Sequence, residues 1–202
     1  MFNLAIDNGL YDKNPIEKIK KYREDNFKVR YLETDEEERL FIAIDELFPY
    51  LRPIVKCALY TGMRKSEILK LQWSQIDFKY KFIEVLASKS GKSRKIPIST
   101  KLFKILTCLK NNNNKYVFVN PKTVTAYKDI KKSFNIVTKK ANVLNFRFHD
   151  LRHTATTRMA AKMPIPVLQE ILGHAKISTT MRYAHVMPAQ KRKAIEVLDS
   201  YD

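Results

Sequence analysis

The sequence contains only two cysteines, and no hydrophobic run in it approaches the length of about 20 residues that a membrane-spanning helix needs. Its first residues, Met1-Phe2-Asn3, lack the pattern of a signal peptide, so we expect no membrane partner and a place in the cytoplasm. Cys57 and Cys108 stand far apart, without the spacing of metal ligands. We expect both to be reduced thiols without a function of their own.

Acidic residues are scarce relative to basic ones. The 38 Lys and Arg residues against 21 Asp and Glu residues give a net charge of +17. Because each phosphate contact releases condensed counterions, such an excess favours a nucleic-acid partner, although charge alone does not distinguish DNA from RNA or from an anionic membrane. With 45% hydrophobic and 29% charged residues in 202, the composition is that of a globular protein with one domain and room for a short appendage.

The segment from His149 to Tyr183 holds three of the four histidines of the chain. If its first five residues open a helix, His149 and Arg152 share a face, where an imidazole and a guanidinium can reach the same ligand. Gly173 predicts a helix end, which leaves His174 in a loop. Tyr183 follows nine residues after that histidine.

This arrangement resembles the tyrosine recombinases of the phage integrase family. Their signature is a helical His-x-x-Arg, a Leu-Gly-His, and a nucleophilic tyrosine nine residues after the last histidine. Any one of these motifs alone is a weak signal, because short motifs recur by chance, but their order and spacing together make a strong one. They stand here as His149-x-x-Arg152, Leu172-Gly173-His174 and Tyr183.

The resemblance covers the chain from about Phe2 to its end, and it implies a mainly helical α+β catalytic domain with a small antiparallel β-sheet over residues 31–202. Residues 1–30 are expected to be the end of an amino-terminal core-binding domain and its linker. They look like the tail of a helix, a turn at Gly9 and an extended exit through Asn14-Pro15. A short natural amino terminus is the alternative.

Residues 61–68 are similar to the family's motif for its first catalytic arginine. Arg64 then lies near the amino end of a helix, where its guanidinium and the backbone N–H groups both favour a phosphate. Glu67, three residues on, can orient Arg64. An arginine beside a glutamate on a helix is also commonly a plain surface ion pair, and this alternative stays open.

A basic hairpin is expected from strands at residues 82–86 and 94–98, with its turn at 90–93. Lys89 lies at the mouth of this hairpin, where the family has a lysine that protonates the leaving 5′ oxygen. That role is implied by the resemblance, since a lysine near a hairpin tip is usually just solvated. The expected contacts with DNA phosphates are Lys92, Arg94 and Arg147.

The remaining elements are expected to be mostly helical. Pro164 and Pro166 stand where the family usually has a glycine turn, and they predict a stiffer turn between two helices. An amphipathic segment at residues 188–201 is expected to fold back on its own core or, as in the family, to dock on a neighbouring protomer. The other expected elements are a helix with a capping box at Thr34, helices at about 52–60, 100–110 and 123–141, and a buried strand at 116–119.

A DNA phosphodiester resists attack because its charge repels nucleophiles and its leaving alkoxide is unstable. Catalysis therefore needs positive charge at the phosphate and a proton for the leaving oxygen, and no metal or other cofactor is required. Arg64 and Arg152 suit the first task. The resemblance implies that Tyr183 attacks to form a 3′-phosphotyrosyl link, Lys89 protonates the 5′ oxygen, His149 assists proton transfer, and His174 donates to the phosphoryl oxygens.

The function favoured by the sequence is site-specific breakage and rejoining of double-stranded DNA, as in integrases, by a tetramer on paired sites at the nucleoid. Three alternatives stay open. One is a DNA-binding protein of the same fold without catalysis, and another is a type IB topoisomerase with the same nucleophile. The third is a zinc site on His149 and His153, which lie four residues apart, although Asp150 replaces the glutamate of the zinc hydrolase motif.

Overall fold

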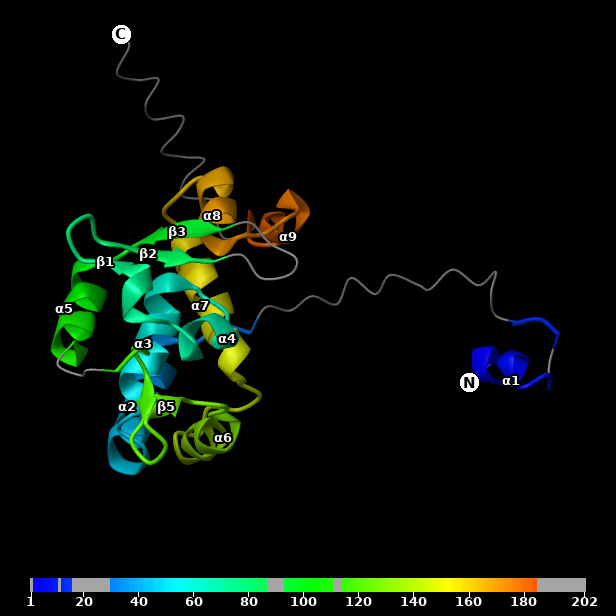
Figure 1. Ribbon diagram of the computed structural model, residues 1–202, viewed down its shortest axis with the longest axis horizontal. Helices are drawn as coiled ribbons and strands as arrows, with labels where there is room; N and C mark the ends of the chain where they lie inside the picture. Colours follow the sequence, from blue (N-terminus) through cyan, green and yellow to red (C-terminus); the bar gives the residue numbers. More distant parts are fainter. Residues whose placement is uncertain (1, 11, 16–29, 87–92, 111–113, 185–202) are drawn as a thin grey trace, which may run out of the picture.

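The computed structural model describes residues 2–10, 12–15, 30–86, 93–110 and 114–184 (Figure 1). These residues form helices and two small antiparallel sheets, which confirms the predicted α+β fold. Figure 1 shows the larger sheet at the same end of the molecule as α8 and α9, with α6 at the other end. None of the helices in the described part of the chain is long and apolar enough to span a bilayer. The predicted division into domains at residue 30 stays a prediction.

The helices are α1 (Phe2–Asp7), α2 (Thr34–Leu47), α3 (Leu51–Thr61), α4 (Lys65–Leu69), η1 (Trp73–Gln75, a 3₁₀ turn), α5 (Thr100–Leu109), α6 (Lys131–Lys140), α7 (Phe148–Ala160), α8 (Ile165–Leu172) and α9 (Ile177–Met181). The strands are β1 (Ile76–Asp77), β2 (Phe82–Val85), β3 (Arg94–Pro97), β4 (Val119–Asn120) and β5 (Thr125–Ala126).

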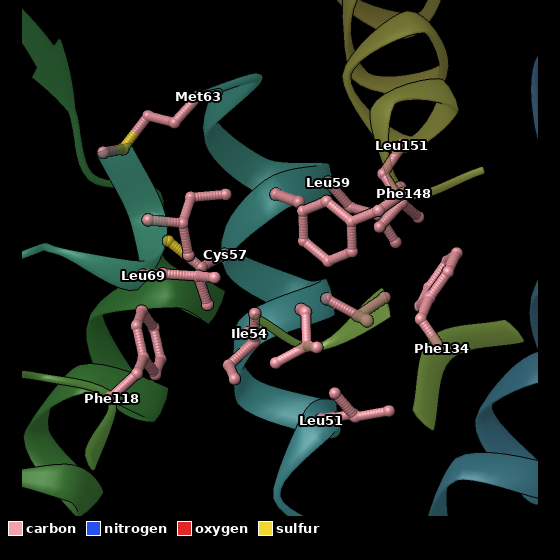
Figure 2. Packing of buried hydrophobic residues seen from close by; sticks show 14 of the residues in the cluster. Leu51, Ile54, Cys57, Leu59, Met63, Leu69, Phe118, Phe134, Phe148 and Leu151 are labelled. Atoms are coloured by element: carbon pink, nitrogen blue, oxygen red, sulfur yellow. The ribbon is translucent and has the colours of Figure 1, made fainter. Parts of the chain in front are cut away.

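Helix α3 forms the centre of the hydrophobic core. Its residues Leu51, Ile54 and Cys57 are fully buried, and it packs against α2, α4, α5 and α7. Figure 2 shows these side chains between Phe134 and Phe148 on one side and Met63, Leu69 and Phe118 on the other. Cys57 is therefore a buried thiol whose pKa is raised by that burial to about 12, whereas Cys108 is exposed.

Helix α3 ends at Gly62, whose φ of 65° lies in the left-handed region. A Cβ added there would lie 2.9 Å from the Leu172 Cδ2 atom and 3.2 Å from the Met159 Cε atom. Gly62 thus lets α3 end in close contact with α7 and α8. The chain then continues to Arg64, the N-cap of α4. The helix expected at about 52–60 is thus observed, and it extends one residue farther at each end.

The N-cap of helix α2 lies one residue before the capping residue that we expected. It is Glu33, and the Glu36 carboxylate accepts a hydrogen bond from the Glu33 N–H at 3.1 Å. The prediction of Thr34 as the capping residue was wrong, because Glu37, three residues after Thr34, pairs with Arg158 at 2.7 Å instead of reaching back to the helix start. Asp35, Glu36 and Glu37 occupy the first turn, as expected from the helix dipole.

The larger sheet has the order β1-β2-β3, with Phe82 opposite Pro97 and Val85 opposite Arg94. The predicted hairpin strands are confirmed, but each ends one residue earlier than predicted, at Val85 and Pro97. The turn that joins them, with Lys89 and Lys92, lies outside the described residues, and so does the expected carboxyl-terminal segment.

The prediction of one helix over residues 123–141 was wrong in its first part. Strands β4 and β5 form a small hairpin instead, in which Val124 has a φ of 54° and donates its N–H to the Asn120 carbonyl. The Asp129 carboxylate then accepts the N–H groups of Ile130 and Lys131, and α6 begins only there. The predicted buried strand likewise begins only at Val119, although Val117 and Phe118 before it are buried.

Replacing Gly62 with alanine tests the close approach of α3, α7 and α8. We expect Gly62→Ala to lower the free energy of unfolding by about 1–3 kcal/mol, since a left-handed alanine costs roughly 1–2 kcal/mol and the methyl group meets Leu172. Urea denaturation measures the loss. The matched control is Gly9→Ala, where φ is 68° and nothing lies within 4 Å of an added Cβ. Equal, small effects of both substitutions would contradict the role of Gly62.

Candidate active site

Helix α7 carries the His-x-x-Arg motif and begins at Phe148, one residue before the predicted start. The Arg147 N–H donates to the Asp150 carboxylate at 2.6 Å, which satisfies an otherwise unpaired group at the helix end. Phe148 and Leu151 turn into the core. Their burial fixes the rotation of the helix and points Arg152 between α3 and α8.

Arg152 is the centre of the site, and only 5% of it is exposed. Its guanidinium donates to the Gly62 carbonyl at 2.6 Å and to the Leu172 carbonyl at 2.8 Å. It also lies 2.9 Å from the Nε2 atom of His174. Burial and the neighbouring Arg64 charge lower the pKa of Arg152 to about 10, so it stays a cation at neutral pH. One side chain thus joins three of the motifs found in the sequence.

His174 follows the left-handed Gly173, as predicted, and lies in the turn between α8 and α9. Burial and the charge of Arg152 lower the pKa of His174 to about 4, so the ring is neutral. Because arginine can only donate, Nε2 accepts the hydrogen bond, and Nδ1 donates to the Thr180 hydroxyl at 2.9 Å. In this state His174 orients Arg152, and a hydrogen bond from Nε2 to a phosphate requires a proton on that nitrogen.

Glu67 joins two arginines. Its carboxylate accepts hydrogen bonds from the Arg64 N–H at 2.8 Å and from the Arg64 guanidinium at 3.1 Å. It also takes two from Arg94, at 2.7 and 3.1 Å. Burial acts to raise the pKa of Glu67, but the bonds from Arg94 and Arg64 outweigh it and hold that pKa below its usual range. Glu67 is therefore a carboxylate in contact with Arg64, and its predicted supporting role in the reaction stays a prediction.

Arg94 turns into the protein rather than towards the surface. Its side chain is 7% exposed, and its Nε–H donates to the Ile171 carbonyl at 2.9 Å. Its Cδ atom lies 2.8 Å from where a Cβ on Gly173 would stand. The predicted phosphate contact of Arg94 stays a prediction, while the observed contacts give it a positioning role between β3, α4 and α8.

Tyr183, the predicted nucleophile, lies just beyond α9 and is 4% exposed. It packs with Ala160, Leu168 and Leu172. Its hydroxyl lies 2.5 Å from the Nδ1 atom of His153. Burial raises the pKa of Tyr183, while the charge of Arg152 acts in the opposite direction. The phenol is therefore protonated at neutral pH and lies within the field of the central arginine.

His149 lies at the surface end of α7, and its ring meets the ring of His153 edge-on with centroids 5.0 Å apart. Desolvation and the charge of Arg152 lower its pKa. Arg147 is exposed and lines a pocket of about 510 Å³ together with Arg30, Lys139 and His153. Among the described residues, no group of three or more His, Cys, Asp or Glu is placed to hold a metal ion.

Most of the predicted site residues in the described ranges lie around the guanidinium of Arg152. These neighbours are Arg64, His174 and Tyr183, with His149 at the edge of the group. The sequence reading missed the contact of His153 with Tyr183. It considered His153 only as a zinc ligand, because a spacing of thirty residues gives no sign of which ring faces a phenol. It also missed the contact of Thr180 with His174, which depends on the turn before α9, and the two carbonyl acceptors of Arg152, since main-chain contacts have no side-chain motif.

The sequence pattern that defines the phage integrase family matches residues 30–190, which is most of the chain. The chain belongs to the phage integrase family. The integrase of Salmonella phage P22 is 34% identical to it, over 95% of this chain and 52% of that protein. The shufflon-specific DNA recombinase of Escherichia coli is 31% identical, over 92% of this chain and 48% of that protein. The chain thus spans about half the length of these two relatives.

Solved integrase structures share the fold. The catalytic domain of bacteriophage HP1 integrase is 32% identical, with a TM-score of 0.67 over 84% of this chain and 95% of that one. The Tn1549 transposon integrase in complex with circular intermediate DNA is 25% identical, with a TM-score of 0.75 over 98% of this chain and 76% of that one. The family expected from the sequence is confirmed.

Replacing Glu67 tests the buried ion pair of this integrase-family site. Because the pKa of Glu67 is depressed in the folded state, its contribution is present above the unfolded value near 4.3 and is lost as pH falls through the folded value. We expect Glu67→Gln to cost about 3 kcal/mol at neutral pH and progressively less below about pH 4. Urea denaturation across this pH range measures both quantities.

The matched control is Glu46→Gln, because Glu46 and its partner Lys140 are both about half exposed. We expect a change within about 0.5 kcal/mol there, as for other surface pairs. A loss for Glu67→Gln that is the same at every pH would contradict the linkage.

Proposed function

We propose that the chain is the catalytic part of a site-specific DNA recombinase, which breaks and rejoins double-stranded DNA through a 3′-phosphotyrosyl intermediate. The observation that carries the proposal is the set of contacts of Arg152 with the carbonyls of Gly62 and Leu172 and with the ring of His174. These contacts bring the segment of Arg64 beside the Leu-Gly-His turn, in a family whose relatives are named integrases and recombinases.

The two arginines would bind the non-bridging oxygens of the scissile phosphate. Arg64 has a side chain that is 44% exposed and is held from behind by Glu67, so its outer edge can meet DNA. Arg152 uses three of its five N–H donors in the contacts above, which leaves two for a phosphate. Two guanidiniums facing one phosphate stabilise the charge that builds up in the transition state.

The remaining roles follow from chemistry and from the family. Tyr183 would attack the phosphorus and release a 5′-hydroxyl, and Lys89 would supply the proton for that oxygen. His149 would assist proton transfer, and His174 would donate to the phosphoryl oxygens once Nε2 carries a proton. Because the covalent link keeps the energy of the phosphodiester bond, a second 5′-hydroxyl can reverse the step without ATP.

The net charge of +17 favours a polyanionic partner, and the relatives named integrase and DNA recombinase point to double-stranded DNA. The exposed Arg147 beside the pocket of His153, together with Lys92, would contact the backbone, and Arg94 would act mainly by positioning Glu67. We propose further that residues 31–202 form the catalytic domain, that residues 1–30 belong to the linker and core-binding domain, and that the enzyme acts as a tetramer on paired sites at the nucleoid.

Replacing Tyr183 with phenylalanine tests the proposal. On a nicked duplex built from the ends of the element that encodes the chain, we expect wild-type protein to form a covalent adduct that resists denaturing electrophoresis. Tyr183→Phe should form none, because it lacks the attacking oxygen. The matched control is Tyr80→Phe, since Tyr80 is 69% exposed and lies in the turn between β1 and β2. This control should keep the adduct.

The outcomes also separate the alternatives. Binding without any adduct would favour a non-catalytic DNA-binding protein. An adduct on duplexes of unrelated sequence, with relaxation of supercoiled DNA, would favour a topoisomerase. An adduct that persists in Tyr183→Phe would overturn the assignment of the nucleophile.

Replacing Arg64 with alanine tests the binding of phosphate in the transition state. We expect the rate of adduct formation to fall about 10²–10³-fold, as for the loss of one oxyanion donor, with little change in stability. The control is Arg52→Ala, because Arg52 is similarly exposed, at 46%, and also pairs with a carboxylate. Equal rates for the two variants would remove Arg64 from the reaction.

A further inference from the structure

The phenol of Tyr183 contacts His153, a residue to which no role in the reaction has been given so far. The Nδ1 atom of His153 lies 2.5 Å from the Tyr183 hydroxyl, and the two rings have centroids 6.2 Å apart with a tilt of 32°. His153 follows Arg152 directly on α7. The same helix therefore presents one side chain for the phosphate and the next one for the attacking oxygen.

The protonation states of the pair are set by their surroundings. Burial and the nearby His149 lower the pKa of His153, so its ring is neutral at physiological pH. Burial raises the pKa of Tyr183, so its hydroxyl carries a proton. In the tautomer that carries its proton on Nε2, Nδ1 is the acceptor for the hydrogen of the phenol. A neutral imidazole that already accepts the proton of a nucleophile has the geometry of a general base.

We propose that His153 is a further catalytic residue, whose Nδ1 atom takes the proton of the Tyr183 hydroxyl as the phenolic oxygen attacks phosphorus. This inference rests on the function proposed above. The O–H bond of the phenol breaks, an N–H bond forms on His153, and a bond forms between oxygen and phosphorus. The 5′ oxygen leaves with the electron pair of its bond to phosphorus and takes a proton from the general acid. In rejoining, His153 returns its proton to the phenol.

His153 fits this step better than His149 does. The hydroxyl of Tyr183 lies against the Nδ1 atom of His153, whereas the ring of His149 meets the ring of His153 edge-on. Together with Arg152, His149 disfavours a second positive charge nearby, whereas Asp150 favours the imidazolium. His149 would therefore tune the base and not replace it.

Other elements also face His153. His174, in the turn after α8, lies near enough for the charges of the two rings to interact. Arg30 and Lys139 line the pocket on its open side with Arg147. Asp150 lines the same pocket and favours the imidazolium, but the cations and burial outweigh it, so the imidazolium is ready to give its proton back in the rejoining step.

The substitution His153→Asn tests the proposal, because the asparagine oxygen can accept the phenol hydrogen bond near the position of Nδ1 but cannot take a proton at neutral pH. On the nicked duplex, with DNA in excess, we expect the rate of adduct formation to fall about 10²–10⁴-fold while DNA affinity is unchanged. The wild-type rate should fall as pH drops through the pKa of His153, below its ordinary value of about 6.5. That acid limb should flatten in His153→Asn.

A second variant keeps the test decisive if His153→Asn folds poorly. In His153→Ala, imidazole added to the solution should restore adduct formation in proportion to its concentration, which a purely structural histidine would not allow. Undiminished or faster cleavage by His153→Asn, or loss of the acid limb in His149→Asn alone, would overturn the proposal. Absence of any Tyr183-dependent adduct in the wild type would instead overturn the recombinase function itself.

Discussion

A guanidinium buried between two helix ends holds this site together. Taking a charged group out of water is costly unless its donors are satisfied, and Arg152 meets that condition with the carbonyls of Gly62 and Leu172. Such carbonyls at the ends of α3 and α8 lack partners within their own helices, and they carry the negative end of the helix dipole. The need of the arginine for acceptors and the need of the helices for donors are met by the same contacts.

A second layer of charge surrounds this centre. Arg94 donates to the Ile171 carbonyl, one residue before the carbonyl that Arg152 uses, and its other donors bind Glu67. Glu67 in turn holds Arg64. Two arginines thus share one carboxylate, and with Arg152 beside them the site keeps an excess of positive charge that suits a phosphate. Burial, and after it this positive charge, lowers the pKa of the neighbouring His153 and His174 rings and keeps both neutral.

Much of this arrangement could be predicted from the sequence, because its motifs depend on local rules. Gly62 and Gly173 end helices where a left-handed residue is needed, and the spacing of His149 and Arg152 follows the turn of a helix. The helix that carries Arg152, the Leu-Gly-His turn and the strands of the larger sheet could therefore be placed from the sequence.

The rest depends on contacts between distant segments. The inward turn of Arg94 could not be predicted, since its partners stand 27 and 77 residues away in the sequence. The contact of His153 with Tyr183 depends on how α7 and α9 pack. The hairpin of β4 and β5 was mistaken for helix because a basic, weakly patterned segment is compatible with a helix and with a strand. The left-handed backbone of Val124, which forms the turn, cannot be recognised from a valine in the sequence.

The acceptors that hold Arg94 and Arg152 are main-chain oxygens of consecutive residues, Ile171 and Leu172. Exchanging these side chains for others of similar bulk leaves both oxygens in place. Inserting or deleting one residue in α8 has a different effect, because it rotates the end of the helix by about 100° and carries the oxygens away from both guanidiniums. The length of α8 is therefore under stricter constraint than its composition, and changes in chain length there should be far less tolerated than substitutions.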